Sequence, residues 1–130
     1  MKDKTIYLCG PIMGCTDSEA NDWRTLVKGL WAGRVLDPMR RDYRGRELES
    51  FEEVVKLDKV DVHQSDALIV NFPGPSVGTA MEIYMAFEMG KLVVVVVSEG
   101  TRISPWLRYH SHVIVNSFEQ AVQRVAEALC

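Results

Sequence analysis

The run from Leu92 to Val97, which has the sequence LVVVVV, constrains the fold more than any other part of the chain. A strand with one face in water alternates apolar and polar residues, whereas this run is apolar at every position. An unbroken apolar run is typical of a central strand in a parallel sheet that helices cover on both faces. It is far shorter than the ~20 apolar residues that a membrane-spanning helix needs. We therefore predict an α/β fold that does not span a membrane.

Shorter apolar segments alternate with amphipathic stretches along the rest of the chain. Strands are predicted at residues 5–9, 34–36, 67–72, 92–97 and 113–115, and helices at 23–31, 51–64, 79–89 and 118–129. This alternation predicts a single five-stranded parallel sheet with right-handed crossovers, in the flavodoxin-like order 2-1-3-4-5, within a three-layer sandwich. The length of 130 residues fits one domain, residues 1–130, because it is near the commonest domain size.

Local signals also predict where several helices begin and end. Gly33 stands where the C-terminal cap of the first helix belongs. Three pairs match the capping box, in which two side chains satisfy free backbone donors at a helix start: Ser50 with Glu53, Thr79 with Glu82, and Ser117 with Gln120. Residues 37–49 carry four arginines without apolar periodicity, so we predict a loop there.

Charge and cysteine content narrow the class of function. The formal net charge of −3 gives no electrostatic reason to bind a polyanion, so nucleic-acid polymers and anionic membranes are not expected partners. The N-terminus has no extended apolar stretch of the signal-peptide type. Cys9, Cys15 and Cys130 form no CxxC pair, and a reducing compartment leaves them as thiols. We expect a cytoplasmic protein in which Cys9 is a small buried residue.

Asp58 is the first candidate for chemistry. At 100° per residue it falls near the centre of the helical arc that carries Val54, Val55 and Val62. A carboxylate on the core side of a helix needs a partner or a function, because burying an unpaired charge is costly. The alternative is a kinked helix, or a side chain that reaches solvent at the edge of the sheet. Asp61 and Asp66 have simpler interpretations as solvated residues at the flank and the end of this helix.

Glu82 is the second candidate. It follows the loop 73–78 and begins a helix that is otherwise almost wholly apolar. Its capping-box spacing fits a structural role as well as a catalytic one. A helix N-terminus stabilises an ionised carboxylate, which suits a nucleophile or the neighbour of a bound anion. In a sheet of this order, the loops 10–14 and 73–78 meet at the ligand crevice, at the carboxyl ends of the strands.

Paired carboxylates at such a crevice indicate glycosidic chemistry. One carboxylate attacks the anomeric carbon and the other supplies and retrieves a proton, although an acidic pair equally suits Mg²⁺. The three histidines, His63, His110 and His112, show no ligand spacing, so they are expected to be structural or surface residues and no metal is expected. The sequence contains neither GxGxxG nor a Walker A motif, and no cofactor is therefore expected.

Three segments stand out as a set. They are residues 6–11 (IYLCGP), Asp58 followed eight residues later by Asp66-Ala67, and residues 76–83 (SVGTAMEI). Together they resemble the nucleoside 2-deoxyribosyltransferase superfamily, which includes the 2′-deoxynucleoside 5′-monophosphate N-hydrolases. The resemblance covers nearly the whole chain and implies a small-molecule nucleotide or nucleoside as the substrate.

The resemblance also implies a role for each matching residue. Glu82 would be the nucleophile that forms a glycosyl-enzyme intermediate, Asp58 the acid/base at the leaving nucleobase, and Tyr7 a catalytic neighbour that orients Glu82 beside the sugar. The substrate-binding residues that it implies are those of the glycine turn and of the loop before Glu82: Gly10, Pro11, Ile12, Gly14, Ser76 and Gly78.

Ser76 favours the hydrolase branch. Typical transferases carry an Asp six residues before the nucleophile, where it binds the free 5′-hydroxyl, whereas the hydrolases resemble this chain in having a serine. A serine donates to a phosphate that a carboxylate would repel. The hydrolases take a second serine from a neighbouring subunit. With a gap of about two residues, Ser104 falls at that place, and the resemblance therefore implies a homodimer or higher oligomer with shared sites. The chain also ends at Cys130, without the longer tail of many transferases.

Two alternatives are kept open. Pro11 suits both branches, so exchange of bases between deoxynucleosides is the first alternative. Flavodoxin-like domains also serve as non-catalytic nucleotide sensors, which is the second. Ser104 has a simpler interpretation as a loop residue before Pro105, and the arginines of residues 40–46 as a solvated loop rather than a lid near the base.

Overall fold

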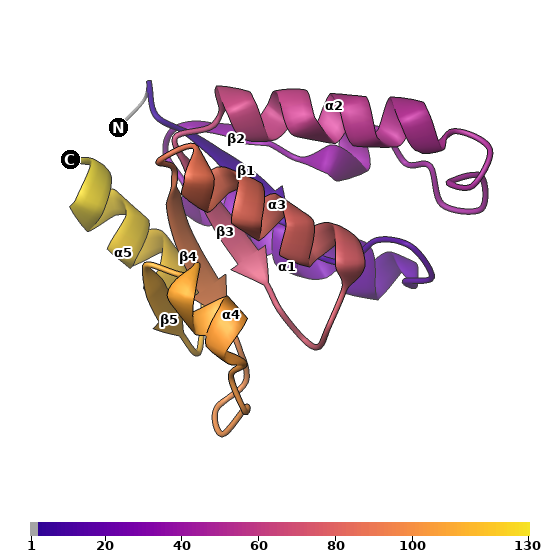
Figure 1. The fold of residues 1–130 in the computed structure, drawn as a ribbon. Helices are drawn as coiled ribbons and strands as arrows, with labels where there is room; N and C mark the ends of the chain where they lie inside the picture. Colours follow the sequence, from indigo (N-terminus) through magenta and orange to yellow (C-terminus); the bar gives the residue numbers. More distant parts are fainter. Residues whose placement is uncertain (1–2) are drawn as a thin grey trace.

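The computed structural model describes residues 3–130, in which strands and helices alternate (Figure 1). The strands are β1 (Thr5–Cys9), β2 (Arg34–Leu36), β3 (Ala67–Asn71), β4 (Leu92–Val96) and β5 (Val113–Val115). The α-helices are α1 (Asp17–Leu30), α2 (Phe51–Gln64), α3 (Val77–Glu88), α4 (Pro105–Tyr109) and α5 (Phe118–Leu129). A 3₁₀ helix, η1 (Pro38–Arg40), follows β2.

The five strands form one parallel sheet in the order β2-β1-β3-β4-β5. This order confirms the predicted topology. β4 pairs with β3 on one side and β5 on the other, and Val93, Val94 and Val95 are fully buried. The apolar run is therefore a strand covered on both faces, as its composition predicts.

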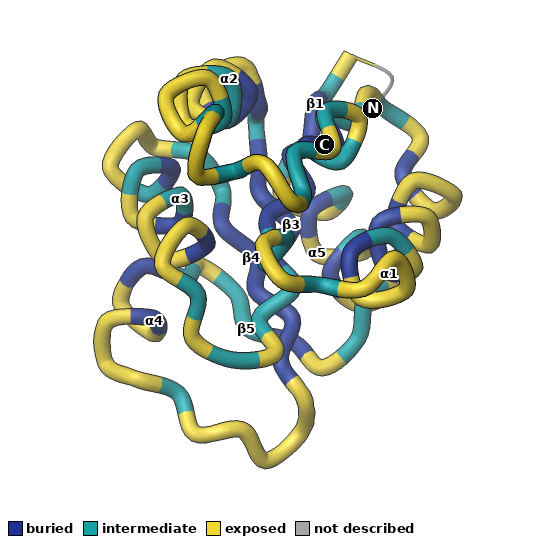
Figure 2. Tube along the Cα trace, turned by 90° about the vertical axis from the view of Figure 1, so that its right-hand side faces the viewer, coloured by how far each residue is buried: buried dark blue, intermediate teal, exposed yellow. Residues whose placement is uncertain are grey.

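Helices cover both faces of the sheet, and Figure 2 shows the buried strands between the exposed outer sides of the helices. α1 and α5 pack on one face, whose core includes Ile6 and Leu8. The other face packs against α2, α3 and α4, and its core includes Tyr7 and Cys9. Because successive side chains of a strand point to opposite faces, β1 directs Tyr7 and Cys9 toward the α3 side of its carboxyl end.

Most predicted elements are confirmed, with shifts at their ends. β3 and β4 each end one residue earlier than predicted, and the short helix α4 was not predicted. α1 begins at Asp17, well before its apolar face, because Thr16 and Glu19 form a capping box with reciprocal bonds of 3.2 and 2.9 Å. It ends at Leu30 and its C-cap is Trp31, so the prediction of Gly33 as the cap was wrong.

The predicted capping boxes are mostly wrong. Ser50 makes no side-chain capping bond to α2. α3 begins at Val77, two residues before the predicted start, which places Thr79 inside the helix and not at its cap. Only Ser117 caps as expected, by accepting from the Gln120 amide at 3.1 Å. The side chain of Gln120 binds the amide of Asn116 instead of returning to Ser117.

Within residues 3–130, none of the helices combines the length and the apolar character that crossing a membrane requires.

Candidate active site

A cleft of about 500 Å³ opens at the carboxyl end of the sheet, where β1 and β3 flank the switch in strand order. Its wall combines the turn after β1, the loop after η1, one side of α2, and the loop that leads into α3. Three of the residues that line it are the candidates Tyr7, Asp58 and Glu82. The fold therefore brings together side chains that are far apart in the sequence.

Glu82 lies in the second turn of α3, because that helix begins at Val77. In this position the carboxylate is too far along the helix to cap it, so the structural alternative for Glu82 as a capping residue is wrong. The side chain instead extends toward β1. Burial raises the pKa of Glu82 to about 7, and the charge of Asp58 adds to this effect, while hydrogen bonds from Tyr7 and Cys9 oppose it.

Two side chains of β1 hold the Glu82 carboxylate. The Tyr7 hydroxyl donates to Oε2 at 2.7 Å, and the Cys9 thiol donates to Oε1 at 3.3 Å. Burial first, and then the charge of Glu82, raise the pKa of both donors, so both keep their protons. Each carboxylate oxygen thus has a fixed donor. Cys9 is a small buried residue, as expected. Its contact with the candidate nucleophile was not predicted from the sequence.

Asp58 faces the same cleft from α2. It accepts a hydrogen bond from Arg41 at 3.1 Å, and its side chain is 24% exposed. Burial raises the pKa of Asp58, whereas the hydrogen bond and the charge of Arg41 lower it. The predicted apolar arc around Asp58 is a core face only in part, since Val62 is fully buried whereas Val55 is 48% exposed. Asp58 therefore has a partner and an opening to the cleft.

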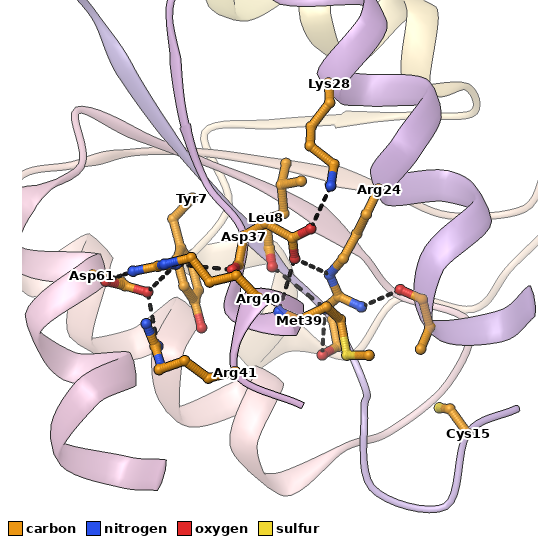
Figure 3. A network of polar contacts seen from close by, with 12 residues as sticks. Tyr7, Leu8, Cys15, Arg24, Lys28, Asp37, Met39, Arg40, Arg41 and Asp61 are labelled. Atoms are coloured by element: carbon orange, nitrogen blue, oxygen red, sulfur yellow. Dashed lines mark hydrogen bonds and ion pairs between the residues drawn. The ribbon is translucent and has the colours of Figure 1, made fainter. Parts of the chain in front are cut away.

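The basic loop after β2 is anchored by α2. Arg40 donates to both carboxylate oxygens of Asp61, at 2.8 and 3.0 Å, and Arg41 donates to Asp61 at 2.9 Å. Figure 3 shows both guanidinium groups converging on this carboxylate. Asp61 is only 3% exposed, so its interpretation as a solvated residue was wrong. Asp66 also has a structural partner, because it accepts from the Thr5 amide at 2.8 Å.

A second part of this network supports the glycine turn. Arg24 of α1 is fully buried and donates to the carbonyls of Leu8 and Gly10, at 3.4 and 3.2 Å. Its Nε lies 3.6 Å from Asp37, which also binds Lys28 at 2.7 Å (Figure 3). The end of β1 is thereby fixed to α1 and to the start of η1.

The glycine turn lines the cleft in part. Gly10, Pro11 and Ile12 are lining residues, whereas Gly14 is not one of them. A Cβ at Gly10 would lie 2.9 Å from a ring carbon of Trp23 and 3.3 Å from the Asn71 carbonyl, so packing requires glycine there. Gly14 has a φ of +77°, which fits a turn-forming role.

The two serines lie in different places. Ser76 precedes α3 and lines the cleft, and its side chain makes no capping bond to the helix. Ser104 lies in a neighbouring apolar groove of about 620 Å³, which Ser76 also lines. Ser104 accepts from the Leu107 amide at 3.1 Å and so caps α4. Within one chain, Ser104 is therefore not a lining residue of the cleft that contains Glu82.

The histidines lie outside this cleft. The ring of His112 accepts from the Val93 amide at 2.9 Å, and that of His110 contacts the Trp106 carbonyl at 2.7 Å. The side chains of residues 3–130 form no group of three or more His, Cys, Asp or Glu that is suited to a metal ion.

Sequence reasoning missed Cys9, Arg41 and Asp61. Two of these had a signal. Cys9 follows Tyr7 by two residues and so shares its face of β1, and Asp61 follows Asp58 by three residues and so shares its side of α2. Arg41 lies in a loop without periodicity, and no local pattern distinguishes it from the other arginines there.

The sequence profile of the nucleoside 2-deoxyribosyltransferase family matches residues 6–123. A comparison with curated proteins gave no significant match.

Three solved structures share the fold. A 2-deoxyribosyltransferase from Bacillus psychrosaccharolyticus is 20% identical, with a TM-score of 0.73 over 89% of this chain and 88% of that one. A conserved protein from Enterococcus faecalis V583 is 16% identical, with a TM-score of 0.74 over 97% and 99%. The CMP N-glycosidase BcmB of Clostridium botulinum is 21% identical, with a TM-score of 0.61 over 95% and 99%.

Proposed function

Because this chain belongs to the nucleoside 2-deoxyribosyltransferase family, we propose that it is an enzyme that cleaves the N-glycosidic bond of nucleoside 5′-monophosphates, whose sugar is 2′-deoxyribose or ribose. The products are a free nucleobase and the 5-phosphate of the sugar. The observation that carries the proposal is the pair of carboxylates, Glu82 and Asp58, facing one cleft, with Glu82 held by Tyr7 and Cys9.

In the first step, Glu82 attacks C1′ of the sugar. The bond from C1′ to the base breaks, its electron pair goes to the base, and Asp58 gives the base a proton. In the second step, a water molecule attacks C1′ and releases Glu82, while the Asp58 carboxylate takes up the proton of that water. The donors on both oxygens of Glu82 orient it and spread the charge that reappears when the intermediate breaks down.

The environment of Glu82 fits a nucleophile that becomes ionised near neutral pH. Burial raises its pKa to about 7, so the ionised form is available there but poorly solvated. A poorly solvated carboxylate attacks an oxocarbenium-like C1′ readily, because formation of the Glu82–C1′ bond neutralises a negative charge that the pocket stabilises weakly.

Ser76 supports the monophosphate branch. The first amides of α3 have no helical carbonyl to bind, and the Ser76 side chain makes no capping bond to them. A phosphate at this helix start would accept from these amides and from the hydroxyl, and the helix dipole favours its charge. Ser76 lines the cleft, and its hydroxyl, unlike a carboxylate at this position, would not repel the phosphate.

A second copy of the chain is part of the proposal. Five apolar or aromatic side chains of α3 and α4 expose between 50% and 77% of their surface: Val77, Met81, Tyr84, Trp106 and Tyr109. Three of them, Val77, Tyr84 and Trp106, line the groove that Ser76 and Ser104 share. An apolar surface of this kind suits a protein partner, and a homodimer would bring Ser104 of one subunit to the cleft of the other. Ser104 accepts from Leu107, which leaves its own proton available for a phosphate.

The experiment incubates the protein with the deoxynucleoside and the deoxynucleoside 5′-monophosphate of each base, and free base is then measured by chromatography. We expect base release from the monophosphates. Formation of a new nucleoside after a second base is added would favour transfer instead. Saturable binding without release of any base would favour the sensor.

A further inference from the structure

Asp61 is buried, and it is linked to the candidate acid Asp58 through Arg41. The same nitrogen of Arg41, Nη2, donates to Asp58 at 3.1 Å and to Asp61 at 2.9 Å. Arg40 binds Asp61 at both oxygens. Two guanidinium groups and two carboxylates thus form one cluster, of which Asp58 and Arg41 line the cleft while Arg40 and Asp61 do not.

A guanidinium bound to Asp58 alone would act against catalysis. An opposite charge at hydrogen-bond distance favours the ionised form of a carboxyl group, whereas the first step needs Asp58 protonated. Asp61 offsets this effect in two ways. It takes the shorter of the two bonds from Arg41, and its negative charge lies on the same helix as Asp58, three residues away.

We infer that Asp61 is a positioning residue that keeps the acid Asp58 in its protonated state by dividing the charge of Arg41. This inference rests on the proposed role of Asp58 as acid/base. Arg40 in turn donates two hydrogen bonds to Asp61. The two carboxylates therefore differ in their surroundings, because Asp61 binds both guanidinium groups whereas Asp58 binds only that of Arg41.

Other charged groups face Asp58 from the elements around it. Arg24 of α1 favours its ionised form, and Glu82 of α3 interacts with it as a like charge. Tyr7 and Cys9 of β1 also interact with Asp58 and stay protonated. None of these groups donates a hydrogen bond to Asp58 in the part of the chain that the structure describes, whereas Arg41 does. Arg41 and Asp61 are therefore the pair to perturb.

The test compares Asp61→Asn with Arg41→Gln, and uses Glu52→Gln as a control. Glu52 also lies on α2, is 71% exposed, and pairs with Lys56 at 3.8 Å. Two quantities are measured against pH: kcat/KM for a deoxynucleotide with a poorly leaving base, and the carbon chemical shift of the Asp58 carboxyl group by NMR.

We expect Asp61→Asn to move the basic limb of kcat/KM, and the Asp58 titration, to lower pH by about one unit, which is a tenfold loss above the limb. Arg41→Gln should move both to higher pH, and Asp61→Glu, which keeps the charge, should restore the wild-type profile. Glu52→Gln should change neither quantity.

An equal loss at every pH, or an Asp58 titration that is unchanged in Asp61→Asn, would overturn the inference and leave Asp61 a purely structural anchor. If Asp61→Asn does not fold, Arg41→Gln is the deciding variant, because Arg40 still binds Asp61 when Arg41 is replaced. An Asp58 titration that does not move in Arg41→Gln would also overturn the inference. A wild type without turnover would refute the proposed function only, since the NMR titration judges the cluster independently.

Discussion

Glu82→Gln keeps the shape of the side chain and removes its charge. It therefore separates the effect of Glu82 on turnover from its effect on the free energy of unfolding. Glutamine offers one acceptor for Tyr7 and places its amide nitrogen near Cys9, whose sulfur is a weak acceptor. We expect a folded protein that retains ligand binding and loses nearly all turnover, because an amide is not a nucleophile.

The same substitution should stabilise the fold at alkaline pH. Burial raises the pKa of Glu82 from 4.5 to about 7. A carboxyl group with a raised pKa gives its full contribution to stability below the unfolded-state value and loses that contribution as pH rises through the folded-state value. At about 1.4 kcal/mol per pH unit, the wild type loses about 3 kcal/mol between these two values, whereas the variant loses none.

Urea unfolding of the wild type and the variant measures this difference. The variant should exceed the wild type by less than 1 kcal/mol at about pH 5 and by about 3 kcal/mol at about pH 8. In a domain of this size, that corresponds to a melting temperature higher by about 10 °C. Glu52→Gln is the matched control, because Glu52 is exposed and should show no such divergence.

A difference that does not grow with pH would refute the reasoning. So would a variant that is less stable than the wild type at the higher pH. Either result would mean that Tyr7 and Cys9 compensate the buried charge fully, and that Glu82 ionises at its ordinary pKa.

Four further predictions concern the reaction. The acidic limb of kcat/KM should lie near pH 7, because Glu82 must be ionised to attack and its pKa is about 7; a rate that is constant down to about pH 5 would contradict this. Asp58→Asn should slow poorly leaving bases most and spare activated ones, and a uniform loss across leaving groups would contradict proton donation. Ser76→Ala should lower kcat/KM for a 5′-monophosphate roughly ten- to a hundredfold with little effect on the nucleoside, and Ser76→Asp should reverse the preference; an unchanged ratio would favour the transferase alternative. Sedimentation should show no active monomer, and a fully active monomer would remove Ser104 from the site.

The topology was predictable because each strand carries its own apolar signal. The run from Leu92 to Val97 identifies β4 without any tertiary knowledge, and the alternation with helices leaves few ways to order the strands. The ends of α3 were not predictable in the same way. The sequence suggests a capping box at Thr79, but the helix begins at Val77. With this start, Glu82 lies in the second turn and reaches Tyr7 of β1, a tertiary contact that local sequence does not show.

The sequence points to a candidate site residue only where the position of that residue is itself unusual. Asp58 stood out because a carboxylate near the centre of an apolar arc is unusual. Asp61 did not, because its environment is made by Arg40, the last residue of a short 3₁₀ helix that no periodicity indicates, and by Arg41, which follows it. The spacing from Asp58 places Asp61 on the same side of α2, but nothing in the helix itself indicates that arginines from another segment bury it, so sequence reasoning assigned it to solvent.

The charges around the cleft explain why the loop arginines lie where they do. Glu82, Asp58 and Asp61 place three carboxyl groups at one end of the sheet, and the cations that face them are Arg24, Arg40 and Arg41. Arg40 and Arg41 both bind the non-reacting Asp61, and Arg24 binds backbone carbonyls of the turn, so no guanidinium donates directly to Glu82 among the described residues. Its only donors there are Tyr7 and Cys9, which are neutral. Neutral donors fix the position of a carboxylate without forming the ion pair that would reduce its reactivity, so a buried tyrosine and thiol, rather than an arginine, suit the nucleophile that we propose Glu82 to be.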